Sequence, residues 1–167
     1  GFSAQSFAQA QPDTISAAIA EARAMINEGN GKGAVARLQS SPDVKEIRVA
    51  QLLGVAYYQA GDLPRALETL APIIDKLPQP SAQRREAVQS LGLAYYIMGR
   101  IADSIPFLEQ TGAWAPNNYE MSYALGMAYL QTRRTAKARE SFARMFRVAP
   151  EGAAAHLVTA QMMIRLE

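Results

Sequence analysis

Few residues in this sequence have the types and spacing that catalysis or metal binding requires. There is one histidine, His156, and there are no cysteines among the 167 residues. A usual zinc site or a serine–histidine triad needs further ligands or partners, and no motif supplies them. The lack of cysteine also excludes disulfides, iron–sulfur clusters and a cysteine nucleophile. We therefore predict no catalytic residue, no metal site, no cofactor and no enzymatic activity.

Two other stretches match binding motifs only in part. The segment GNGKGAV, residues 29–35, carries the glycines of a phosphate loop. That loop needs four residues between its first glycine and Gly-Lys, and then a serine or threonine. Here Gly33 follows Lys32, so we predict a turn between helices. The basic residues within 133–147 are interrupted by Glu140 and share no single helix face, which favours a solvated outer surface.

Size and composition limit the class of protein. Hydrophobic residues make up 49% of the chain and charged residues 19%, which excludes disorder as a global state. The net charge of +2 is too small to indicate a nucleic-acid partner. No run of 18 apolar residues occurs, so no transmembrane segment is predicted.

The sequence repeats itself. The segment LGVAYYQAGDLPRALETL at residues 53–70 is followed by LGLAYYIMGRIADSIPFL at residues 91–108, and a third Leu-Gly pair begins at Leu125. Each copy continues with a tyrosine, a small residue, a large apolar residue and a proline at matching intervals. These anchors are Tyr57, Ala66, Leu70 and Pro78, then Tyr95, Ser104, Leu108 and Pro116, then Tyr129, Ala138, Phe142 and Pro150.

The anchors predict pairs of closely packed helices. A leucine and a tyrosine four residues apart lie on one helix face, and the glycine beside the leucine lets a second helix approach. Gly61 and Gly99 can take positive φ and end the first helix of a pair. The prolines end the second helix, because proline lacks an N–H and clashes with the preceding turn.

These anchors resemble the tetratricopeptide repeat, which has an aromatic residue, Leu-Gly, Tyr, Ala, Phe and Pro in 34 residues. This chain departs from the pattern where Ala50, Val88 and Ser122 replace the aromatic residue, and where Arg133 stands in place of a turn glycine. The resemblance implies an all-α fold, a right-handed α-solenoid of antiparallel helix pairs. We expect about four repeats followed by a terminal helix.

The expected organisation is an N-terminal tail over residues 1–14 and a repeat array over 15–167. Within the tail, Ala8 and Ala10 form a small-residue pattern that signal peptidase accepts. We therefore expect an exported protein, periplasmic or envelope-associated, with a cytoplasmic location as the alternative. The repeats are expected at 15–45, 47–80, 85–118 and 119–152, with the terminal helix at 153–167.

The resemblance implies that the first helices of the repeats line a concave groove, and it indicates which side chains face that groove. In this chain the residues at those positions are apolar, aromatic or amide-bearing. Members of the family that bind a C-terminal carboxylate carry cations at several of them, so we expect a different ligand here. The candidate partner-binding residues are Gln51, Val55, Tyr58, Gln89, Leu93, Tyr96, Tyr123, Met127 and Leu130.

The function expected from these features is a non-enzymatic scaffold for protein–protein interaction. A peptide or an amphipathic helix would bind in the groove and help to assemble a larger complex. Burial of the groove residues by another part of the chain is the competing structural explanation. Two alternatives stay open: a tetratricopeptide domain cut from a longer enzyme or regulator, and a module that forms homo-oligomers through its terminal helices.

Overall fold

The structure, a computed structural model, describes residues 14–167, and every regular element within them is a helix. The tail pattern at Ala8 and Ala10 lies outside the described residues. The elements are α1 (Thr14–Asn27), α2 (Gly31–Gln39), α3 (Ile47–Gln59), α4 (Leu63–Leu70), a short 3-10 helix η1 (Ile74–Lys76), α5 (Ala82–Ile97), α6 (Ile101–Trp114), α7 (Tyr119–Gln131), α8 (Thr135–Phe146) and α9 (Ala153–Arg165).

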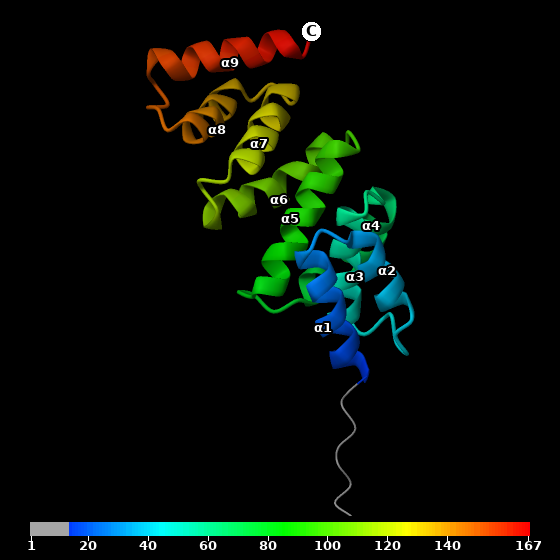
Figure 1. Ribbon diagram of the computed structural model, residues 1–167. Helices are drawn as coiled ribbons and strands as arrows, with labels where there is room; N and C mark the ends of the chain where they lie inside the picture. Colours follow the sequence, from blue (N-terminus) through cyan, green and yellow to red (C-terminus); the bar gives the residue numbers. More distant parts are fainter. Residues whose placement is uncertain (1–13) are drawn as a thin grey trace, which may run out of the picture.

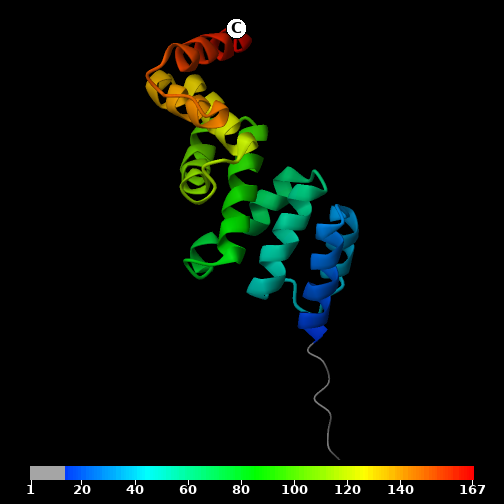
Figure 2. The ribbon, with the colours of Figure 1, turned by 60° about the vertical axis from the view of Figure 1, so that its left-hand side comes forward.

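The helices form consecutive pairs that stack in chain order. Each odd-numbered helix up to α7 packs against the even-numbered helix that follows it, and each even-numbered helix also contacts the first helix of the next pair. Figures 1 and 2 show the resulting elongated array, with α1 and α9 at opposite ends. This arrangement confirms the predicted α-solenoid of antiparallel helix pairs. The predicted limits of the individual repeats stay predictions.

The turns inside the pairs need a left-handed backbone, and they use it at matching places. Gly61 and Gly99 have φ of +82° and +77°, as predicted. Arg133 takes the same place in the fourth pair with φ of +60°, although a side chain disfavours this conformation. Its N–H donates to the carbonyl oxygen of Leu130 at 3.0 Å, as the N–H of Gly61 donates to that of Tyr58. The arginine therefore preserves the turn geometry.

Polar side chains cap several of the helices. Ser81 caps α5, because its hydroxyl accepts the backbone N–H of Arg84 at 3.0 Å, and Asn118 caps α7 in the same way. Of the segment 29–35, Gly29 and Asn30 lie in the turn between α1 and α2, while residues 31–35 are the first residues of α2, with Asn30 as its N-cap. No helix among residues 14–167 is both long and apolar enough to cross a membrane.

Close contact within the pairs depends on the glycine of each Leu-Gly motif. Gly54 faces Leu70, Gly92 faces Leu108, and Gly126 faces Phe142. A Cβ atom added at Gly126 would lie 2.5 Å from Cε1 of Phe142, whose side chain is fully buried. The same addition at Gly92 would meet Leu108 Cδ2 at 3.1 Å. The large side chain of the second helix therefore occupies the space that the missing side chain leaves.

Gly126→Ala tests this contact. We expect it to lower the free energy of unfolding by about 1–3 kcal/mol, because the buried Phe142 ring has no room to move away from the new methyl group. The measurement is urea denaturation followed by circular dichroism at helical wavelengths.

Gly112→Ala is the matched control for that prediction. Gly112 lies within α6, and an added Cβ there meets no atom within 4 Å. This variant should raise the stability by up to about 1 kcal/mol, because alanine loses less backbone entropy in a helix. Equal effects of the two substitutions would contradict the packing role of Gly126.

Candidate functional site

The nine candidate groove residues lie on α3, α5 and α7, the first helices of three successive pairs. Their exposure divides them into two groups. Five are buried, with 2–8% of the side chain surface exposed: Gln51, Val55, Leu93, Met127 and Leu130. The other four are half-buried: Tyr58, Gln89, Tyr96 and Tyr123. Only the second group offers side chains to a partner, while the first forms the floor beneath it.

Among the half-buried residues, Tyr58 also has a packing role. Its ring contacts all three buried hydrophobic clusters of the described chain, which belong to successive parts of the array. Tyr96 and Tyr123 pack only against the cluster built around Leu125 and Phe142. Truncating Tyr58 would therefore remove core contacts together with any contact to a ligand. Substitutions at Tyr96 and Tyr123 therefore test ligand binding more directly.

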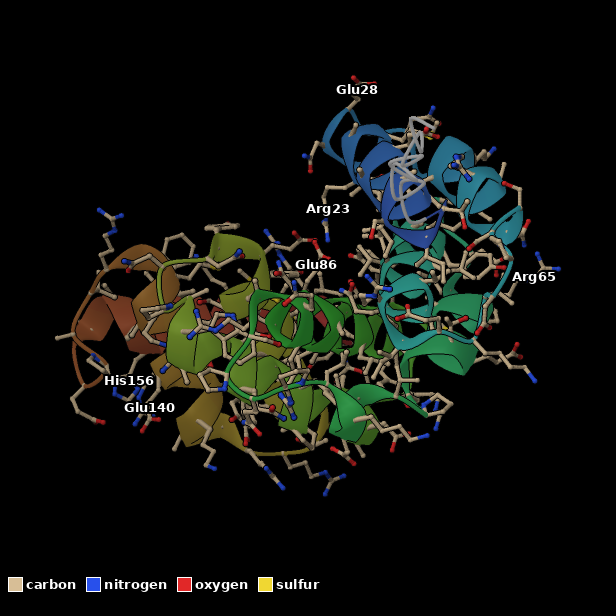
Figure 3. The ribbon with its side chains drawn as sticks, turned by 90° about the horizontal axis from the view of Figure 1, so that it is seen from below. Arg23, Glu28, Arg65, Glu86, Glu140 and His156 are labelled. Carbon is tan, nitrogen blue, oxygen red and sulfur yellow. The ribbon has the colours of Figure 1, made fainter. Side chains whose placement is uncertain are left out.

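An ion pair crosses the surface of these helices. Arg23 of α1 donates two hydrogen bonds to the carboxylate of Glu86 of α5, at 2.7 and 2.9 Å. Figure 3 shows the two side chains pointing toward one another from the two helices. Helix α3 packs against both α1 and α5, so the pair reaches across α3. Side chains from non-adjacent positions can meet in this way only where the surface curves inward.

The buried amide of Gln51 completes this contact. Its Nε2 atom donates to Oε1 of Glu86 at 3.0 Å and to the carbonyl oxygen of Gln83 at 3.1 Å. Gln51 is thus one of the candidate residues, but its hydrogen bonds are directed to the protein itself. Arg23 and Glu86 were not predicted to be partners, because they are 63 residues apart in the sequence. Their placement on groove-facing positions of two repeats was the available signal.

Two hollows lie on this face, one on each side of the ion pair. The first has a volume of about 330 Å³ and lies over α1, α3 and the start of α5, with Arg23, Arg48 and Gln51 in its wall. The second has about 240 Å³, and residues of α1, α3, α5 and α7 line it, among them Tyr58, Glu86 and Glu120. The face therefore carries cations at one hollow and carboxylates at the other.

Burial favours the protonated form of the tyrosines on this face. Burial raises the pKa of Tyr58 to about 12, and the nearby negative charge of Glu120 adds to the effect. Burial also raises the pKa of Tyr96, with a smaller contribution from Tyr123. These hydroxyls stay protonated at neutral pH and can both donate and accept hydrogen bonds.

The remaining sequence candidates lie away from this face. His156 is exposed on α9, and Figure 3 shows it far from Arg23 and Glu86. A larger hollow of about 470 Å³ lies at the turn side of α2, α3 and α4, lined by Lys32, Tyr57 and Arg65 among others. No group of three or more histidine or acidic side chains among residues 14–167 could hold a metal ion.

Tyr58→Phe tests the burial of the hydroxyl through the pH dependence of stability. A tyrosine whose pKa is higher in the folded chain loses its proton more easily when unfolded, so stability falls as pH rises from about 10 to about 12. The Phe variant should show a shallower fall in the melting temperature over that range and an unchanged value at pH 7. Identical alkaline profiles of the two proteins would contradict this burial.

Comparison with known proteins agrees with the geometry described above. The tetratricopeptide repeat family model matches residues 95–162, from the end of α5 into α9. No curated protein sequence matches the chain.

Several solved structures share the fold. MamA AMB-1 has a TM-score of 0.69 at 24% identity over 92% of this chain and 80% of that one. MamA MSR-1 has 0.68 at 25% identity, over 90% and 83%, and MamA from Desulfovibrio magneticus RS-1 has 0.68 at 20% identity, over 92% and 85%. The family match identifies tetratricopeptide repeats within residues 95–162, and the array as a whole shares its fold with the MamA structures.

Proposed function

We propose that the face formed by α1, α3, α5 and α7 binds a segment of a protein partner, as an extended peptide or an amphipathic helix. The observation that carries this proposal is the row of half-buried aromatic side chains above a buried apolar floor. Tyr58, Tyr96 and Tyr123 come from three successive first helices, and the hollows lie beside them. Aromatic groups with an apolar body and a polar tip are common anchors in protein interfaces.

A non-enzymatic scaffold is the role that suits these features. The surface offers apolar area, amide groups and phenol hydroxyls, and it spans four helices. Such a surface can bind a segment of a partner chain along the length of that segment without catalysing a reaction on it. A location at a bacterial envelope belongs to the same proposal, and its support is the small-residue pattern at Ala8 and Ala10.

Peptide selection followed by NMR tests the binding face. Peptides selected from a random display library on the immobilised protein would be titrated into the ¹⁵N-labelled chain. We expect shifts at backbone amides of α3, α5 and α7, and little change along α4, α6 and α8, because the hollows lie on the first helices.

Tyr123→Ala provides the mutational arm of that test. Tyr123 is half-buried and packs against one cluster only, so the variant should keep its helical content and weaken the selected peptides by about tenfold, as truncation of an aromatic anchor does. Shifts confined to the even-numbered helices would place binding elsewhere and overturn the proposal.

Self-association is a second candidate function, and the exposed face of α9 favours it. Ala155, Thr159 and Met162 of this helix are buried against the preceding helices. On its other side Leu157 and Ile164 are 60% and 67% exposed. Exposed apolar patches of this kind mark interaction sites in many proteins, and a second copy of the chain is one occupant that would cover the face.

Light scattering over a concentration series tests this candidate. If α9 mediates association, the wild-type mass should rise with concentration, and Leu157→Glu together with Ile164→Glu should hold the protein as a monomer, because charge at the interface costs desolvation. Val44→Glu, at an exposed apolar residue before α3, is the matched control and should leave association unchanged. A monomeric wild type at every concentration would exclude the candidate.

A further inference from the structure

The second hollow of the binding face, lined mainly by α3 and α5, differs from the rest of the face in its charge. Its floor includes Val55 and Leu93, both buried, and its wall includes the amide of Gln89. Two carboxylates, Glu86 and Glu120, stand at its sides, and no cationic side chain is among the residues that line it. The hollow thus combines an apolar floor with negative charge at the rim.

The two carboxylates are in different electrostatic situations. The charge of Glu86 is met by the guanidinium of Arg23 and by the amide of Gln51. Glu120 lies exposed in the first turn of α7, and none of the ion pairs within residues 14–167 includes it. Glu120 therefore keeps its charge available to a ligand, beside the ring of Tyr58.

We propose that this hollow receives a lysine or arginine side chain of the bound partner, with the cationic tip at Glu120 and the apolar stem on Val55 and Leu93. The proposal rests on the binding role proposed above and specifies the partner as one that carries a basic anchor residue. The long stems of lysine and arginine cover apolar surface while the head group reaches a polar rim.

The size of the hollow agrees with a single side chain. Its volume of about 240 Å³ is below the ~300–1,000 Å³ of sites that enclose a drug-sized molecule. An acidic side chain of the partner would lie between two carboxylates and be repelled by them. A short apolar side chain would leave the carboxylate of Glu120 without a partner when binding removes water from this surface. A long cationic side chain is complementary both to the apolar floor and to the negatively charged rim.

The chain itself shows the kind of contact expected at Tyr58. Four aromatic rings within residues 14–167 carry a cation: Arg65 over Tyr57, Arg85 over Trp114, Arg100 over Tyr95, and Lys137 over Tyr129, at 4.7–5.9 Å from the ring centroid. Tyr58 is not among those rings. A basic anchor held by Glu120 would lie next to the Tyr58 ring and could make the same contact from outside.

The test uses the peptides selected on the whole protein. Peptides that shift amides of α3, α5 and α7 should share a lysine or arginine, and its replacement by norleucine should weaken them about tenfold or more, since a charge-assisted contact is lost. Glu120→Gln should weaken the original peptides to the same degree and leave the norleucine peptides unaffected. That non-additivity identifies Glu120 as the partner of the basic residue.

Glu140→Gln is the matched control, because it removes the same charge from an exposed position on α8. It should leave every affinity unchanged. Peptides that bind the face without a basic residue, or that bind Glu120→Gln as tightly as the wild type, would overturn this inference and leave the proposed function intact. If no selected peptide shifts the amides of the first helices, both are overturned.

Discussion

The whole array depends on how closely the two helices of each pair approach one another. At the point of contact a glycine of the first helix meets a large side chain of the second, as Gly126 meets Phe142. Small residues on the second helices are fully buried as well: Ala66, Ser104 and Ala138. Packing of helices at such short range leaves no room for larger side chains at these positions, and dense interiors tolerate little extra volume. The interval between these small residues therefore fixes which faces of the helices meet.

The second helices of the pairs pack on one side of the array, and the first helices form the surface on the other side. Each first helix contacts the next, from α1 through α3 and α5 to α7. The Arg23–Glu86 pair reaches across α3 and joins the first of these helices to the third. Both side chains are about one third exposed, so water screens the pair and its contribution to stability is small. Its greater effect is to separate the face into two hollows.

As a result, the charge on the face differs between its two ends. Arg23 and Arg48 lie at the hollow near α1, and Glu86 and Glu120 lie at the hollow that extends to α7. A bound segment with charge at one end would meet different surroundings in its two possible orientations, because like charges placed together cost free energy. In the proposed complex, apolar contact with the tyrosines would supply binding area, and the charges would select the direction and sequence of the bound segment.

The periodic anchors made the architecture predictable, because each acts within a helix or between its neighbours in the chain. Leu-Gly, the turn glycines and the caps at Ser81 and Asn118 are local signals: α5 and α7 begin directly after the caps, and α3 and α5 end just before Gly61 and Gly99. The proline signal was less exact, because α4 ends at Leu70, well before Pro78, and η1 lies between them. Even the departure at Arg133 left the turn unchanged. The face bearing Tyr58, Tyr96 and Tyr123 was predicted from the resemblance to the tetratricopeptide repeat, whose groove-facing positions these residues occupy.

Exposure and pairing were decided by the tertiary structure. The spacing placed Gln51 and Leu93 on the same face as Tyr96, but the curvature of the array buried the first two and left the third accessible. Curvature also brought Arg23 to Glu86, 63 residues later, and left Glu120 without such a partner. A repeat pattern specifies the direction in which a side chain leaves its helix. The distance from that side chain to a residue two helices away depends on the small rotation between each helix and the next. These rotations add up along the array, and the sequence of a single repeat does not determine their sum.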